Sequence, residues 1–139
     1  GGRGISISRS SSATFGANCS ASNNGNDGIF VGAQSGCILY SGFIINNNAQ
    51  SGLSVKTSSY CESFGGGLQI KNNAFNVEVI SNSFMNFFND GTEDVAGVTG
   101  GAYNITASFG AYIDAINVIG NGSTNITPNT VTIDGVIRT

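Results

Sequence analysis

A nine-residue phrase that recurs at one fixed spacing, with copies beginning at positions 4, 28, 52 and 76, constrains this chain more than any other feature. It reads Gly-Ile-Phe-Val-Gly-Ala-Gln-Ser-Gly at 28–36 and Gly-Leu-Ser-Val-Lys-Thr-Ser-Ser-Tyr at 52–60, with related copies at 4–12 and 76–84. Internal periods of about 20–50 residues are typical of stacked architectures, in which each repeat buries its apolar face against its neighbours. The spacing therefore predicts a solenoid.

Each copy of the phrase begins with two apolar residues separated by one other residue. These pairs are Ile5 and Ile7, Ile29 and Val31, Leu53 and Val55, and Val77 and Val79. Alternation with period two indicates a strand with one buried face. A whole repeat separates successive strands, so they cannot be hairpin partners, and we expect parallel neighbours, one in each coil.

Two further strands in each coil, joined by polar corners, complete the predicted repeat. The second strand points inward at Ala13 and Phe15, Cys37 and Leu39, Cys61 and Ser63, and Met85 and Phe87; the third does so at Cys19 and Ala21, Phe43 and Ile45, and Leu68 and Ile70. Serines 11, 35, 59 and 83 share one corner, and asparagine pairs at 23–24, 47–48 and 72–73 share another, once the glycine run 65–67 absorbs one inserted residue. Stacked side chains of these types satisfy backbone groups that a corner leaves unpaired.

The repeat becomes less regular in the last third of the chain. Residues 89–95 are interpreted as a looped excursion, followed by a fifth coil with strands at 103–106 and 116–119 and a sixth that begins with one strand at 130–137. The predicted fold is all-β: a right-handed parallel β-helix of about six coils, each of roughly 24 residues. It forms a single domain over 1–139, which we expect to be a fragment of a longer chain. The hairpin signals of an antiparallel sandwich and the glycine-rich nonapeptides of a calcium-binding β-roll are both missing.

Composition excludes several classes of partner. Five Lys and Arg residues and a net charge of −3 argue against binding nucleic acid, and no apolar run approaches the roughly 20 residues of a membrane-spanning helix. The three cysteines form no CxxC pair and the chain has no histidine, so we expect no metal site and no cofactor. Buried thiols are the favoured interpretation. Stacking would place Cys37 and Cys61 about 4.8 Å apart, which permits a disulfide without requiring one.

Four features of the sequence resemble a known family of proteins. They are the coil length, the phrase Gly-Ile/Leu-x-Val at 28–31 and 52–55, the asparagine pairs and the stacked serines. Over nearly its whole length the chain resembles the pectate-lyase-like superfamily of right-handed β-helices, and its Asn- and Gly-rich, nearly charge-free style is most similar to bacteriophage tailspikes. That resemblance implies a homotrimeric virion protein that recognises, and often cleaves, bacterial surface polysaccharide. No lyase motif is carried over, because the basic catalytic residues of pectate lyases have no counterpart among the five Lys and Arg residues.

Carboxylates are the candidate catalytic groups, because glycoside hydrolysis uses two of them about 5–5.5 Å or 6.5–9.5 Å apart. Glu78 points outward from a first strand, and a loop that folded back would bring Asp90, Glu93 and Asp94 towards it. No two acids occupy equivalent places in adjacent coils, so solvated surface acids are the favoured interpretation. The lack of histidine excludes catalysis of the Ser-His or Cys-His type within this chain.

Aromatic residues on the outward side of the second strands are the candidate binding groups. Tyr40, Phe64 and Phe88 form one predicted column, and Tyr60 and Phe84 form another. An apolar stripe of this size is larger than scattered surface residues account for, so something should cover it. Burial between the parallel subunits of a homotrimer is the favoured use, and stacking against sugar rings is the alternative.

Three classes of function stay open at this point. The first is a tailspike segment that binds bacterial surface polysaccharide, located in the virion. The second is a polysaccharide hydrolase or lyase with an acidic site, completed by groups outside this chain or on a neighbouring subunit. The third is a structural shaft of a virion spike or of an adhesin, the latter extracellular or on the bacterial cell surface.

Overall fold

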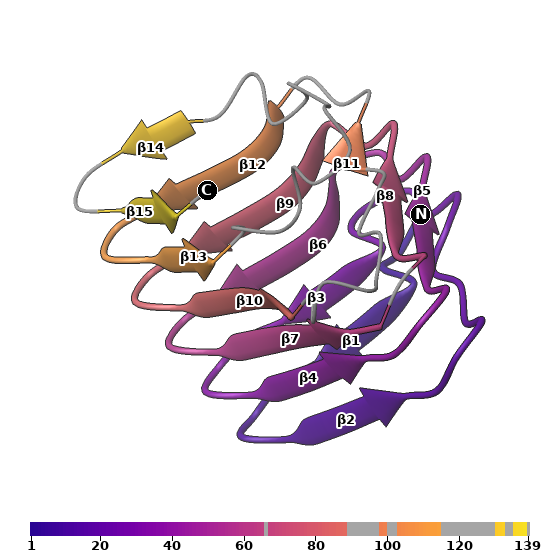
Figure 1. Ribbon diagram of the computed structural model, residues 1–139, viewed down its shortest axis with the longest axis horizontal. Helices are drawn as coiled ribbons and strands as arrows, with labels where there is room; N and C mark the ends of the chain where they lie inside the picture. Colours follow the sequence, from indigo (N-terminus) through magenta and orange to yellow (C-terminus); the bar gives the residue numbers. More distant parts are fainter. Residues whose placement is uncertain (66, 89–97, 100–102, 115–129, 133–134, 139) are drawn as a thin grey trace.

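The chain folds into a parallel β-solenoid (Figure 1), as its repeat predicts. This computed structural model describes residues 1–65, 67–88, 98–99, 103–114, 130–132 and 135–138. All regular secondary structure in these ranges is β-strand, which confirms the all-β fold class. Within the same ranges, no helix has the length and apolarity needed to cross a membrane.

Successive coils add their strands to three parallel sheets. Sheet A contains β1 (Ile5–Ile7), β3 (Ile29–Val31), β6 (Ser51–Lys56), β9 (Phe75–Ile80), β12 (Tyr103–Ser108) and β14 (Thr130–Thr132). Sheet B contains β2 (Ser12–Phe15), β4 (Gly36–Leu39), β7 (Tyr60–Phe64), β10 (Phe84–Phe88), β13 (Tyr112–Asp114) and β15 (Val136–Arg138). Sheet C contains β5 (Ile44–Asn46), β8 (Gln69–Lys71) and β11 (Val98–Thr99). Figure 1 shows sheet B in front of sheet A, with the strands of sheet C at one side.

Within the described ranges, about four coils have a strand or bridge in all three sheets, fewer than the six expected. Sheet C supplies three strands, and a bridge from Ser20 to Ile44 extends it into the first coil. The last two coils contribute strands to sheets A and B only, within the described ranges. The predicted strand at 116–119 and the predicted loop at 89–95 lie outside those ranges. The single strand predicted at 130–137 is wrong, because the chain passes from sheet A to sheet B between β14 and β15.

The solenoid interior consists of columns of matched apolar side chains. Ile5, Ile29, Leu53 and Val77 stand in register in sheet A, as predicted, and Ile105 continues the column. Sheet B contributes the column Ala13, Cys37, Cys61, Met85 and Ile113. All members of both columns are buried except Ile5 and Ala13 in the first coil, which are half-buried. The inward positions read from the sequence are confirmed.

Cys37 and Cys61 are neighbours in this interior and both are free thiols. A hydrogen bond between the two thiols, together with burial, raises the pKa of Cys61 well above its usual value. Because the thiolate is the reactive form, the Cys61 thiol is chemically quiet. The third cysteine, Cys19, is also free and is half-buried rather than buried.

The predicted serine ladder runs along the corner between sheets A and B. The hydroxyl oxygens of Ser35, Ser59 and Ser83 each accept a hydrogen bond from the backbone N–H of the serine one coil earlier, at 3.2, 3.1 and 3.2 Å. Each of the three hydroxyls also lies 3.4–3.5 Å from the carbonyl two residues before it and donates to that oxygen. The serine hydroxyls therefore bond to corner backbone groups rather than to other hydroxyls.

An asparagine ladder closes the corner between sheets C and A. Asn48 Oδ1 accepts from the backbone and side-chain nitrogens of Asn24 at 2.9 and 2.8 Å, and Asn73 Oδ1 accepts from the same two groups of Asn48 at 2.8 and 3.0 Å. Asn76 Oδ1 in turn accepts from the backbone and side-chain nitrogens of Asn73. The residue before each ladder asparagine, at 23, 47 and 72, has a positive φ of 57–60°. Asparagine tolerates this conformation, which explains why the pairs recur.

Candidate functional site

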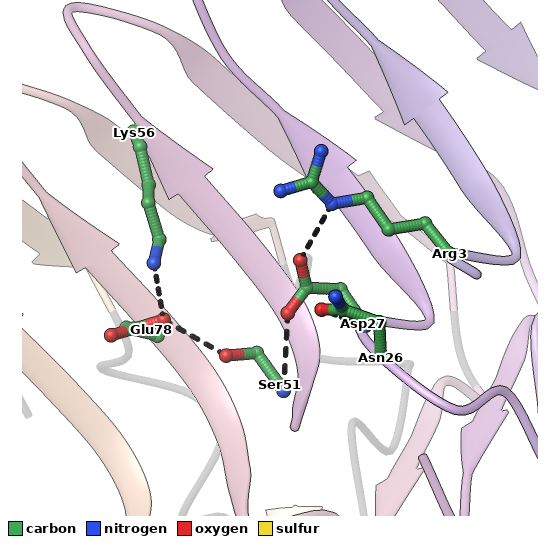
Figure 2. Close-up of polar contacts among 6 residues, drawn as sticks. All are labelled: Arg3, Asn26, Asp27, Ser51, Lys56 and Glu78. Atoms are coloured by element: carbon green, nitrogen blue, oxygen red, sulfur yellow. Dashed lines mark hydrogen bonds and ion pairs between the residues drawn. The ribbon is translucent and has the colours of Figure 1, made fainter. Parts of the chain in front are cut away.

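Glu78, the acid predicted on a first strand, points outward from sheet A and has its charge satisfied. It lies on β9 in register with Ser54 on one side and Thr106 on the other. One oxygen of its carboxylate, Oε2, lies 2.9 Å from Lys56 Nζ and accepts a hydrogen bond from Ser51 Oγ at 2.9 Å (Figure 2). Glu78 is therefore a member of a polar network and not a freely solvated acid.

Asp27 extends this network towards the amino terminus (Figure 2). Its Oδ1 accepts from the backbone N–H of Ser51 at 3.3 Å, and its Oδ2 accepts from Arg3 Nε at 2.9 Å. The Arg3 guanidinium also lies over the ring of Phe30, 3.7 Å from its centroid. Four successive coils are thus joined on the outside of sheet A. The sequence does hold a signal for this, since Arg3, Asp27 and Ser51 occupy the same place in three successive repeats.

The geometry of the network is better suited to stabilising the contact between successive coils than to catalysis. Both carboxylates are paired with a basic group, and the Asp27 side chain is only 5% exposed against 19% for Glu78. A glycosidase acid must reach the substrate and give up a proton, whereas these carboxylates already accept hydrogen bonds. The other three predicted acids, Asp90, Glu93 and Asp94, lie outside the described ranges. Among the residues that the structure describes, no three His, Cys, Asp or Glu side chains are grouped as metal ligands.

The predicted aromatic residues gather on the outward side of sheet B, which we call the aromatic face. Its described rings are those of Tyr40, Tyr60, Phe64, Phe84 and Tyr112. Phe84 stacks on Tyr112 with ring centroids 5.4 Å apart and an interplanar angle of 8°. Tyr40 stacks on Phe64 at 6.0 Å and 29°. Phe88 is in backbone register with Phe64, which agrees with its predicted column.

Tyr112 belongs to the column of Tyr60 and Phe84 but was not found from the sequence. It is the register partner of Phe84, and Tyr60 is the register partner on the other side. The interval from Phe84 to Tyr112 is longer than the regular repeat, because the fourth coil contains additional residues. A search at fixed spacing therefore misses it.

A polar column separates the two aromatic columns. Glu62, Asn86 and Asp114 are in register along it, and the apolar Ile38 occupies the same position one coil before Glu62. Phe64 lies four positions after Tyr60 along β7, a span of about 13 Å in an extended strand. The row on β7 thus reads ring, polar group, ring, with Tyr60, Glu62 and Phe64. On β10, Phe84 and Asn86 repeat the first two of these groups in register. The sequence predicted an apolar stripe, and the structure shows a mixed surface.

The charged side chains of β4, β7 and β10 on the aromatic face are acidic. No lysine or arginine occurs in β2, β4, β7, β10 or β13, and Arg138 in β15 is the register partner of Asp114. The carboxylate of Glu62 makes no hydrogen bond or ion pair with any described residue. The face therefore offers flat apolar rings beside an open hydrogen-bond acceptor, a combination that suits a ligand with both apolar faces and hydroxyl groups.

Comparison of the chain with protein-family models, with curated proteins and with solved structures found no match. The parallel β-solenoid is shown by the structure itself. The likenesses to pectate lyases and to tailspikes stay predictions from the sequence.

Proposed function

We propose that this chain is a carbohydrate-binding segment of a β-solenoid, and that it recognises polysaccharide through the aromatic face. The observation that carries the proposal is the row of ring, polar group and ring on β7, whose first two groups are repeated in register on β10. A sugar residue has an apolar C–H surface that packs on a ring and hydroxyls that bond to carboxylate and amide groups. Rows repeated at about 4.8 Å intervals would let a polymer make such contacts along the solenoid.

The polar column also separates this function from the other use considered for the aromatic residues. Interface cores between protein subunits are depleted of charged residues. Here Glu62 lies between two rings on β7, and two of the most exposed rings of the face are tyrosines whose hydroxyls need polar partners. Glycan binding accounts for both features, while burial against another subunit would require the Glu62 carboxylate to be desolvated.

The resemblance of the sequence to tailspikes extends the proposal to the whole protein. We propose on that basis that the chain is part of a pectate-lyase-like tailspike, that the glycan is a bacterial surface polysaccharide, and that the protein is a homotrimer in the virion. Polysaccharide hydrolysis or cleavage and a purely structural shaft are the alternatives. The pairing of Glu78 with Lys56 favours binding over hydrolysis at sheet A.

Tyrosine fluorescence provides the test, because the chain has four tyrosines and no tryptophan. The chain is titrated with a panel of purified bacterial surface polysaccharides. We expect saturable binding of at least one member and a loss of about tenfold in affinity, or about 1.4 kcal/mol, in Phe84→Ser. Phe30→Ser is the matched control, since Phe30 is an outward ring on sheet A. Absence of binding across the panel, or equal losses in both variants, contradicts the proposal.

A further inference from the structure

Tyr60 is the one member of its column that does not stack on its neighbour. It is in register with Phe84, yet the described rings pair as Phe84 with Tyr112 and Tyr40 with Phe64, and Tyr60 is in neither pair. Its ring instead leans towards the preceding coil, with its tip over Gly36. Tyr60 keeps 45% of its surface exposed.

Gly36 is what allows the ring to lie there. A Cβ built on Gly36 would stand less than 3.0 Å from both Cζ and the hydroxyl oxygen of Tyr60, closer than real Cβ atoms approach other atoms. The backbone of Gly36 is not in the positive-φ region, so alanine is compatible with its conformation. Glycine is therefore required at position 36 only because a larger residue would collide with the Tyr60 side chain.

The groups around the Tyr60 ring determine which kind of ligand could bind there. Glu62 lies two residues along β7 on the same outward side, and its carboxylate has no hydrogen-bond or ion-pair partner among the described residues. A carboxylate only accepts hydrogen bonds, so it selects hydroxyl or amide donors. No lysine or arginine lies on β4, β7 or β10 to offset its charge, so an anionic sugar would be repelled.

We propose that Tyr60 and Glu62 form a subsite for a neutral sugar residue. Gly36 determines the shape of this subsite, because the absence of a side chain there lets the Tyr60 ring lie over the preceding coil. The sugar packs on the exposed ring and donates hydroxyl hydrogen bonds to Glu62. This inference rests on the proposed polysaccharide binding. It adds the class of sugar and names the residue that makes the subsite.

The decisive variant is Gly36→Ala, measured with the same polysaccharides grouped into neutral and uronic- or sialic-acid-containing members. The new methyl group displaces the Tyr60 ring, and we expect the affinity for the neutral binders to fall about tenfold. Tyr60→Ser should cause a similar loss. Adding Gly36→Ala to Tyr60→Ser should cost nothing more, because both changes act through one ring. Far-UV circular dichroism checks that each variant is folded.

Gly32→Ala is the matched control on sheet A. A Cβ on Gly32 would stand 2.5 Å from the Phe30 ring. The variant therefore displaces an aromatic ring that lies over a glycine, as Gly36→Ala does, but on sheet A rather than on the aromatic face. It should leave affinity unchanged. Glu62→Gln should weaken the neutral binders and reduce discrimination against the anionic ones.

The possible outcomes separate the subsite from the general proposal. Preferential binding of anionic polysaccharides overturns the neutral-sugar assignment. Binding of neutral polysaccharides that is unaffected by Gly36→Ala and by Tyr60→Ser overturns the subsite, while the proposed function stands. Failure of the whole panel to bind overturns both.

Discussion

Neighbouring residues on one strand of this solenoid point to opposite faces of the sheet, and this decides what each contributes. Leu53 on β6 points inward and is fully buried between Ile29 and Val77. Ser54, the next residue, points outward, and its hydroxyl is buried without a partner among the described residues. Alternation of faces along a strand explains the contrast.

Leu53→Ala should reduce the free energy of unfolding by about 2–5 kcal/mol, because the stacked coils cannot close around the space left. Denaturant unfolding followed by circular dichroism measures it. A loss below about 1 kcal/mol, less than such core truncations cost, would show that the inward face is assigned wrongly.

Ser54→Ala is the companion variant on the same strand. Removing a buried hydroxyl that has no hydrogen-bond partner among the described residues should leave stability unchanged or raise it. A substantial loss in this variant would mean that the hydroxyl has a partner after all.

At the scale of elements, the corners hold the register of the sheets. The side chain of Asn48 accepts two hydrogen bonds from Asn24, and it donates to Asn73 and to the carbonyl of Ala21. These bonds tie three consecutive coils together at one corner. Buried polar groups of this kind are expensive to leave unpaired.

Asn48→Ala should therefore destabilise the fold by about 2 kcal/mol or more, since it orphans several buried groups at once. Asn47→Gly, at the exposed neighbouring position with positive φ, should change stability by only a few tenths of a kcal/mol. The same unfolding experiment compares them. Equal effects would mean that the ladder does not stabilise the corner.

The elements could be predicted from the sequence wherever the repeat keeps its regular spacing. Inward columns, serine and asparagine ladders and the columns of Tyr40 and Tyr60 all follow from it, because stacking turns equal spacing into vertical neighbours. Prediction fails after Phe88, where the longer fourth coil hides the alignment of Tyr112 with Phe84. It also fails for the lean of Tyr60 over Gly36, because a side-chain rotamer depends on space created one coil away.

For the whole molecule, stacking makes each surface a continuous strip along the solenoid. Sheet A carries the network from Arg3 to Glu78 on its outside, and sheet B carries the aromatic face. Each coil contacts only its neighbours, so a strip of matched groups arises from repetition of one local arrangement. The same strip could serve a polymer or a second copy of the chain.

Self-association distinguishes these two uses. If the aromatic face binds glycan, removing a ring from it should leave the mass in solution unchanged, whether the chain is a monomer or a trimer. Sedimentation of the unmodified chain and of Phe64→Ser at tens of micromolar measures this. A trimer that dissociates on Phe64→Ser would place the rings at a subunit interface.

The most direct test of the account is a crystal structure of the chain with an oligosaccharide from the polysaccharide that binds best. We predict a neutral sugar ring packed on Tyr60, with a hydroxyl within hydrogen-bond distance of the Glu62 carboxylate, and further sugar residues along the aromatic face. Sugar bound at the Asp27 and Glu78 network, or a second copy of the chain covering the rings, would contradict it.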